Sequence, residues 1–103
     1  MRVTWTELSV KKLEEIADYI SIDNQVSAKK WVIDIQKSVT KLTDFPELGR
    51  IVPEIERKEI RELIQGNYRI IYKRRDNEIT ILTIRSFFQL LSERDIYKTS
   101  KLS

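Results

Sequence analysis

The chain of 103 residues contains neither cysteine nor histidine. The absence of cysteine excludes a disulfide framework, a thiolate metal site and a thiol nucleophile. The absence of histidine removes the side chain that most often acts as a general base or binds a transition metal. The sequence also has no glycine-rich loop that could cradle phosphate groups. We therefore expect no metal and no cofactor, and any acid–base chemistry would rely on Glu, Lys, Arg or Tyr.

Long apolar runs are absent, and glycine and proline are scarce. No stretch approaches the run of about 18 apolar residues that spans a bilayer, and the first residues lack the layout of a signal peptide. Both prolines and one of the two glycines lie within residues 45–54, which indicates a connection between two elements. We expect a cytoplasmic protein without membrane association, with a single domain over residues 1–103 and a polar tail from about residue 98.

Basic residues are in slight excess, and they are unevenly distributed. Residues 1–50 hold eight Lys or Arg and eight Asp or Glu, whereas residues 51–103 hold eleven against eight. The net charge of +3 therefore belongs to the C-terminal half. A basic surface there would attract a nucleic acid or an acidic protein segment. Because +3 is small for a dedicated nucleic-acid-binding protein, a solvated, slightly basic face explains the charge more simply.

Two segments have the apolar spacing of amphipathic helices. The first follows Thr6, a suitable N-cap, and its apolar residues are Val10, Leu13, Ile16, Ala17 and Ile20. The second follows a polar break at residues 21–24, where Asp23 or Asn24 can cap it. Its apolar residues are Ala28, Trp31, Val32, Ile35, Val39 and Leu42, and Pro46 ends it. The two segments predict a helical hairpin that must pack on another surface.

The other regular segments have the pattern of β-strands. Residues 1–6 alternate apolar and polar side chains, which predicts a short strand. Residues 60–64 and two runs within residues 66–85 are rich in Ile, Tyr and Thr, and turns at Gly66-Asn67 and at residues 75–78 would join them into an antiparallel meander. The predicted fold class is α+β, with a short N-terminal strand and a helical hairpin packed on a small antiparallel sheet (β-α-α-β-β-β). We expect Phe45 and Leu48 to anchor the connection before the sheet.

Several arginines lie in or beside the predicted strands, where a guanidinium needs solvent or an anionic partner. They are Arg50, Arg61, Arg69 and Arg85. If they converge on one face, they would bind phosphate and could stabilise the transition state of RNA cleavage. If each pairs with a carboxylate such as Glu54 or Glu62, their role is structural. Spacing leaves both open, although pairing suits Arg50 better and function suits Arg69 better.

Aromatic side chains in the same half are candidates for binding a partner. Tyr68 and Tyr72 lie four residues apart and share one face of a strand. They could stack on bases or donate a phenolic proton, or simply cover the edge of the core with their hydroxyls in water. At the end of the last strand, we expect one ring of Phe87-Phe88 to enter the core and the other to face solvent. An exposed ring beside Leu90 and Leu91 would form an apolar patch for a partner, unless the segment curls back and buries all four residues.

Motifs along the chain resemble those of a known superfamily. They are Leu13-x-x-Ile16-Ala17-x-x-Ile20, Ala28-x-x-Trp31-x-x-x-Ile35, Phe45-Pro46-Glu47-x-Gly49-Arg50-x-Val52-Pro53-Glu54, Arg61-Glu62-Leu63 and Gly66-x-Tyr68-Arg69-Ile70-Ile71-Tyr72. In this order and spacing, from Val3 to about Leu91, the chain resembles the RelE/ParE superfamily of type II toxin–antitoxin toxins, and in particular the ParE-like (plasmid stabilisation) branch. The resemblance implies a growth-arresting toxin that a cognate antitoxin neutralises by covering the sheet and the helical hairpin.

The resemblance leaves three mechanisms open. A ParE-like toxin would inhibit DNA gyrase and would not be an enzyme. A RelE-like toxin would be a ribosome-dependent mRNA endoribonuclease, with Arg61, Arg69, Arg85 and Tyr97 as the catalytic candidates. A weakened toxin would retain only antitoxin binding, because Phe87-Phe88 replaces the histidine–tyrosine pair of related nucleases and the charged pair of many ParE-like members. The branch that the chain resembles favours gyrase, with Tyr68, Tyr72, Phe87 and Phe88 as the partner-binding candidates.

Overall fold

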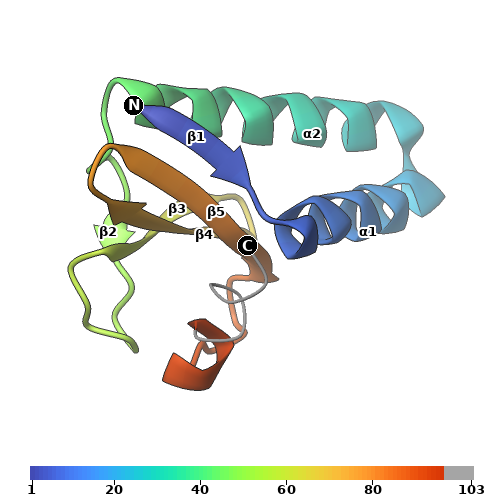
Figure 1. Cartoon of the computed structure of the whole chain (residues 1–103). Coiled ribbons are helices and arrows are strands. Elements are labelled where there is room, and N and C mark those ends of the chain that lie inside the picture. Colours follow the sequence, from blue (N-terminus) through green and yellow to red (C-terminus); the bar gives the residue numbers. More distant parts are fainter. Residues whose placement is uncertain (97–103) are drawn as a thin grey trace.

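A five-stranded sheet with a helical hairpin on one face forms the framework of the computed structural model, which describes residues 1–96 (Figure 1). The elements in chain order are β1 (Arg2–Trp5), α1 (Glu7–Asp23), α2 (Gln25–Thr40), the 3₁₀ helix η1 (Lys41–Thr43), β2 (Arg50–Ile51), β3 (Ile60–Gln65), β4 (Tyr68–Arg75) and β5 (Glu78–Ser86). The strands lie in the order β1-β5-β4-β3-β2. The predicted α+β class and the succession of strand, hairpin and meander are confirmed.

Side-chain caps set the boundaries of the two helices, as the sequence predicts. The hydroxyl oxygen of Thr6 accepts a hydrogen bond from the backbone N–H of Ser9 in the first turn of α1. Asn24 ends α1 and begins α2, where its side-chain oxygen accepts from the backbone N–H of Ser27. The break between the helices is this single residue, which is shorter than the four-residue polar break that we predicted.

The sheet is mixed, whereas the sequence predicted an antiparallel one. β3, β4 and β5 form the predicted antiparallel meander, with turns at Gly66 and at Asp76-Asn77. β1 pairs in parallel with β5 and places Arg2 beside Glu78, and the two-residue β2 adds an edge strand that we did not predict. A parallel neighbour requires a crossover connection, and the helical hairpin between β1 and the meander provides it.

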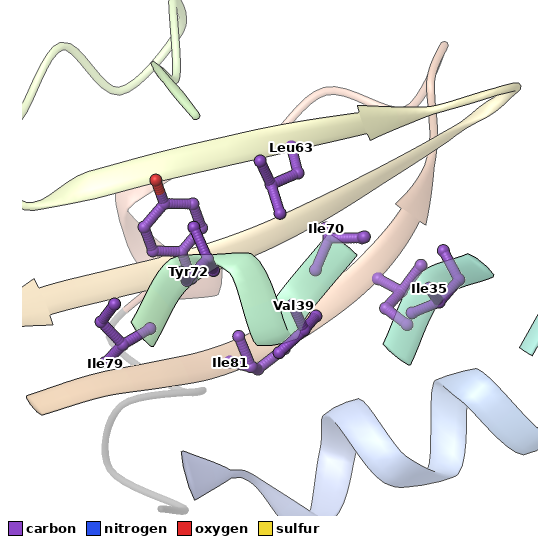
Figure 2. Packing of buried hydrophobic residues seen from close by; sticks show 9 residues of the cluster. Ile35, Val39, Leu63, Ile70, Tyr72, Ile79 and Ile81 are labelled. Carbon is purple, nitrogen blue, oxygen red and sulfur yellow. The ribbon is translucent and has the colours of Figure 1, made fainter. Parts of the chain in front are cut away.

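Apolar side chains pack against both faces of the sheet. The face under the hairpin, here called the helix face, carries a buried cluster of Ile35, Val39, Leu42, Leu63, Ile70, Tyr72, Ile79, Ile81 and Ile84 (Figure 2). The opposite face, here called the second face, carries a buried cluster of Val52, Ile55, Ile60, Ile71, Leu82, Leu91 and Ile96. Because successive side chains of a strand point to opposite faces, Ile70 and Ile71 of β4 belong to different clusters. The second cluster fixes the segment that follows β5 against the sheet.

Hydrogen bonds between the Tyr72 hydroxyl and the loop backbone hold the connection between η1 and β2. The apolar side chains that we expected to hold it do not. Phe45 is 63% exposed and Leu48 is also exposed, so the prediction that they anchor the connection in the core is wrong. The buried hydroxyl of Tyr72 instead donates to the carbonyl oxygen of Pro46 at 3.0 Å and accepts from the N–H of Gly49 at 3.0 Å. The backbone of the loop therefore contacts the core, and its apolar side chains remain in solvent.

Gly49 lies where this loop contacts β3, and its packing generates a prediction. A Cβ atom at position 49 would overlap the carbonyl oxygen of Glu62 and lie 2.8 Å from Cε1 of Tyr72. We expect Gly49→Ala to lower the free energy of unfolding by about 2 kcal/mol through overpacking, measured by urea denaturation. At Gly66 a Cβ would meet no atom within 4 Å, so Gly66→Ala should cost only about 1 kcal/mol from its positive φ. Equal losses in the two variants would contradict the steric explanation.

Candidate functional site

The guanidinium of Arg69 is the centre of a network of charged side chains on the second face. The Arg69 side chain is only 3% exposed. Its Nε donates to Oε1 of Glu62 at 2.6 Å. Its two terminal nitrogens donate to the two carboxylate oxygens of Glu54 at 2.7 and 2.8 Å, and Nη1 also donates to the backbone carbonyl of Gln89 at 2.8 Å. Each guanidinium nitrogen therefore has a carboxylate partner.

Strand register brings these charged groups together. Glu62 of β3 lies opposite Ile71 of β4, so its side chain shares the second face with Arg69, two residues earlier in β4. Arg50 of β2 lies opposite Glu62, and its Nε donates to the second oxygen of Glu62 at 2.6 Å. The fully buried carboxylate of Glu62 thus lies between two guanidinium groups, which compensate the cost of removing its charge from water.

Hydrogen bonding fixes the charge state of this network. The bonds from the Arg69 guanidinium lower the pKa of Glu54 from its ordinary 4.5 to about 2. The bonds to Glu54 in turn raise the pKa of Arg69 above its ordinary value. Both groups therefore remain ionised at neutral pH. A carboxylate with so low a pKa is a weak general base, and the donors of Arg69 are already bonded to protein acceptors.

The arginines named as catalytic candidates do not all share a face. Arg61 of β3 lies opposite Tyr72, so its side chain is on the helix face. Its Nη1 donates to the backbone carbonyl of Gly49 at 2.9 Å, next to the bond that Tyr72 makes to the same loop. Arg69 and Arg85, by contrast, lie opposite each other on β4 and β5. The structure therefore brings together two of the three arginines and separates Arg61 from them.

Arg85 contacts the segment that follows β5. Its Nη1 donates to the backbone carbonyl of Leu90 at 3.0 Å, and its Nη2 lies 3.1 Å from Oδ1 of Asp95. This guanidinium is only partly buried, but both contacts are with the chain's own C-terminal segment. Tyr97, the fourth catalytic candidate, lies outside the described residues.

The two tyrosines of β4 occupy the helix face, and their exposure differs. Tyr68 is half-buried, and its ring packs edge-to-face on Trp31 of α2, with 5.3 Å between the ring centroids. Tyr72 has no exposed surface, and burial raises the pKa of its hydroxyl. Tyr68 therefore retains surface that a partner could contact, whereas Tyr72 acts inside the protein by holding the 46–49 loop.

Both phenylalanines after β5 are exposed, together with Leu90. Phe88 is 82% exposed and Leu90 77%, and Phe87 is exposed to a smaller extent. The two rings pack edge-to-face with 5.4 Å between their centroids. We expected one ring to enter the core, but Leu91 occupies that position in the second cluster. The residues Phe87, Phe88 and Leu90, here called the apolar loop, form a surface with the composition of a protein-binding site.

The helical hairpin carries a second apolar surface, which we did not predict from the sequence. A groove of about 480 Å³ between α1 and α2 has the lining residues Ala17, Asp18, Ser21, Gln25, Ala28, Lys29, Val32 and Ile33. Exposed apolar residues lie close to it in sequence: Tyr19, Ile22, Val26 and Ile33. The sequence could have indicated this surface, because these apolar residues lie outside the buried stripe of each helix. This surface, here called the hairpin groove, has a volume within the usual range for binding sites.

The described residues 1–96 include no helix of the length and apolar character needed to cross a membrane. The same residues include no group of three or more acidic side chains placed to hold a metal ion.

Removal of Arg69 would leave the buried carboxylate of Glu62 without one of its two guanidinium partners. We expect Arg69→Ala to lower the free energy of unfolding by about 3–5 kcal/mol, as breaking a buried ion pair does, in a urea denaturation experiment. Arg57→Ala is the control, because Arg57 pairs with Glu59 and Glu93 at the surface and should cost about 1 kcal/mol or less. If the two variants lose similar stability, the Arg69 network does not support the fold.

The low pKa of Glu54 predicts a specific response to acid. Because its folded pKa of about 2 lies below the ordinary 4.5, its contribution to stability is fully present above about pH 4.5 and is lost as the pH falls toward 2. Glu54→Gln removes this titration, so the variant should be less stable than the parent at neutral pH and should lose less stability over that acidic window. Urea denaturation as a function of pH measures both, and parallel curves would contradict the assignment.

Comparison with known proteins identifies the family. A family model described as the ParE toxin of the type II toxin–antitoxin system parDE matches residues 3–87. A solved structure, the chromosomal ParDE toxin–antitoxin system from P. aeruginosa, is similar with a TM-score of 0.69 and 27% sequence identity, over 84% of this chain and 95% of that chain. A search of curated proteins gives no match. Because the family model covers most of its residues, the chain belongs to the ParE toxin family of type II toxin–antitoxin systems.

Proposed function

We propose that this chain is a cytoplasmic toxin that arrests growth by inhibiting DNA gyrase and is neutralised by a cognate antitoxin. The observation that carries the choice of mechanism is the saturation of Arg69 by Glu54 and Glu62. Family membership supports the toxin role, and this geometry favours a protein that binds its target over one that cleaves RNA.

RNA cleavage by attack of a 2′-hydroxyl needs a base, an acid and cationic stabilisation of the phosphate. In the described residues, Arg69 has a carboxylate on each nitrogen and lies almost entirely out of solvent. Arg61 lies on the other face of the sheet. Glu54, which pairs with Arg69, is a weak base because of its pKa of about 2. These arrangements stabilise the protein and leave few groups for catalysis.

The apolar loop is the proposed contact with gyrase. Aromatic side chains dominate the energetics of protein interfaces, because each buries a large area at a low entropic cost. Phe88 and Leu90 project into solvent and Phe87 packs against the ring of Phe88. Tyr68, also exposed in part, lies opposite Ser86 at the adjacent end of β4. We propose that these residues form one target-binding surface, and we do not include the fully buried Tyr72.

The hairpin groove is the proposed site of the antitoxin. The similar solved structure is described as a ParDE toxin–antitoxin system, which supports an antitoxin partner for this chain. A groove between two helices with apolar side chains on its rim suits an amphipathic segment laid along it. The hairpin packs on the helix face, whereas the apolar loop follows the strand end and its anchor Leu91 packs on the second face. The two partners would bind different residues, although Tyr68 of the proposed target surface contacts Trp31 of α2 on the helix face.

The mechanism is tested by expressing the chain from a tightly regulated promoter while following growth, the DNA-damage response and mRNA integrity. Growth arrest with DNA damage and intact mRNA is the expected result. Purified protein should also inhibit DNA supercoiling by gyrase. Arrest with fragmented, ribosome-associated mRNA would overturn the proposal in favour of a ribonuclease, and soluble protein without any arrest would indicate a weakened toxin.

Phe88→Ala tests the target-binding surface directly. Because the ring is 82% exposed, its removal should change the free energy of unfolding by about 0.5 kcal/mol or less. If it contacts gyrase, the concentration needed for half-inhibition of supercoiling should rise by about tenfold or more, as for other interface aromatics, while antitoxin binding persists. Phe45→Ala is the matched control, since it removes an exposed ring from another loop. Equal inhibition by both variants would exclude the apolar loop as the contact.

A further inference from the structure

The segment after β5 is bonded through its backbone to charged side chains of β4, β5 and the loop between β2 and β3. Each of three consecutive residues has one backbone group held in this way. Arg69 donates to the carbonyl of Gln89 at 2.8 Å, and Arg85 donates to the carbonyl of Leu90 at 3.0 Å. The carboxylate of Glu54 accepts from the N–H of Leu91 at 3.0 Å. The backbone of the sheet takes no part in these three bonds, so residues 89–91 are held here by three charged side chains.

The ends of the same segment are fixed by further contacts. At its start, the N–H of Phe87 donates to the carbonyl of Asn67 at 2.6 Å, and the Gln89 side chain accepts from the N–H of Ser86 at 3.2 Å. At its end, Leu91 is buried in the second cluster. Between these fixed points, Phe88 and Leu90 project into solvent. The segment thus combines an immobilised backbone with exposed apolar side chains.

We propose that Arg69, Arg85 and Glu54 are positioning residues that hold the apolar loop in the conformation that binds the target. This inference rests on the proposed function, in which the apolar loop contacts gyrase. The three residues do not touch the target themselves. They fix the backbone at residues 89–91, and the backbone in turn fixes the direction of the exposed side chains.

The physical reason is the entropy of binding. A loop that samples many conformations loses that freedom when it binds, and the loss weakens the complex. A loop fixed in advance avoids this loss. Charge-assisted hydrogen bonds suit the task, since they are shorter and stronger than neutral ones. Glu54 connects the parts, because one carboxylate accepts from both Arg69 and the N–H of Leu91, so the loop is bonded to the buried centre of the sheet.

Arg85 is the member of the set that can be altered with least damage to the fold. Its side chain is partly exposed, unlike that of Arg69. Arg85→Gln removes the ion pair with Asp95 and the charge-assisted bond to Leu90. Arg74→Gln is the matched control, because Arg74 of β4 alternates onto the helix face and pairs with Glu47 at the surface. Arg85→Lys retains the charge and a donor, and it serves as the rescue variant.

Two measurements on the full chain separate positioning from general stability. Hydrogen exchange followed residue by residue reports on the amides of Phe87, Gln89 and Leu91, with the amide of Ile71 as the core reference. In Arg85→Gln we expect exchange of the loop amides to rise by about tenfold with Ile71 unchanged, since only local opening is favoured. Growth arrest and gyrase inhibition should weaken by about tenfold as preorganisation is lost, with Arg85→Lys intermediate and Arg74→Gln close to the parent.

Each outcome decides the inference. If the loop amides exchange equally fast in the parent and in Arg85→Gln, the loop is not held by this residue and the inference is wrong. If the loop loosens but arrest is as strong as in the parent, loop order does not serve target binding and the positioning role fails. If the parent arrests growth without inhibiting gyrase, the gyrase proposal fails while arrest still tests positioning. If the parent causes no arrest, both the toxin proposal and the positioning role fail. Hydrogen exchange then reports only whether Arg85 holds the backbone of the loop.

Discussion

The bonding of a buried guanidinium to two carboxylates is the interaction on which the second face of this sheet depends. Arg69 would be costly to bury alone, and Glu62 would be equally costly. Together with Arg50 and Glu54 they form a compensated set, which connects β2, β3 and β4 with the segment after β5. Two arginines and two glutamates carry no net charge together, so the set does not form a basic, phosphate-binding patch. The pairing of Arg69 with two carboxylates therefore favours a structural role over a catalytic one.

The sequence contained enough to predict the elements but not the partners of the charged residues. Apolar periodicity, Thr6 and Asn24 located both helices, and the turn residues Gly66 and Asp76-Asn77 located the meander. The role of Arg69 was not predictable, because it depends on which residue of β3 lies opposite which residue of β4. A register shifted by one residue would have moved Glu62 to the other face. The parallel pairing of β1 was hidden for a similar reason, since strand order leaves no local signal.

The path of the chain after β5 illustrates a second limit. Alternation predicted that one of two adjacent phenylalanines would be buried, but alternation applies only while the backbone remains extended. The turn after Ser86 ends that regularity and allows both rings to face solvent, while Leu91 enters the second cluster. The loop before β2 shows the same effect, since hydrogen bonds to Tyr72 orient its backbone inward and leave Phe45 outside. Apolar residues in both loops are thus exposed to solvent.

The pairing of β1 with β5 has a consequence for how the protein is made. Arg2 lies beside Glu78 and Trp5 beside Ile81, so the first strand finds its neighbour only after most of the chain has been synthesised. Contacts between residues so distant in sequence form slowly, because a long loop must close before they contribute. A ribosome that has produced only the helical hairpin therefore holds a chain whose sheet cannot yet exist. The order of synthesis thereby delays the appearance of a folded toxin until the strands of the sheet have emerged.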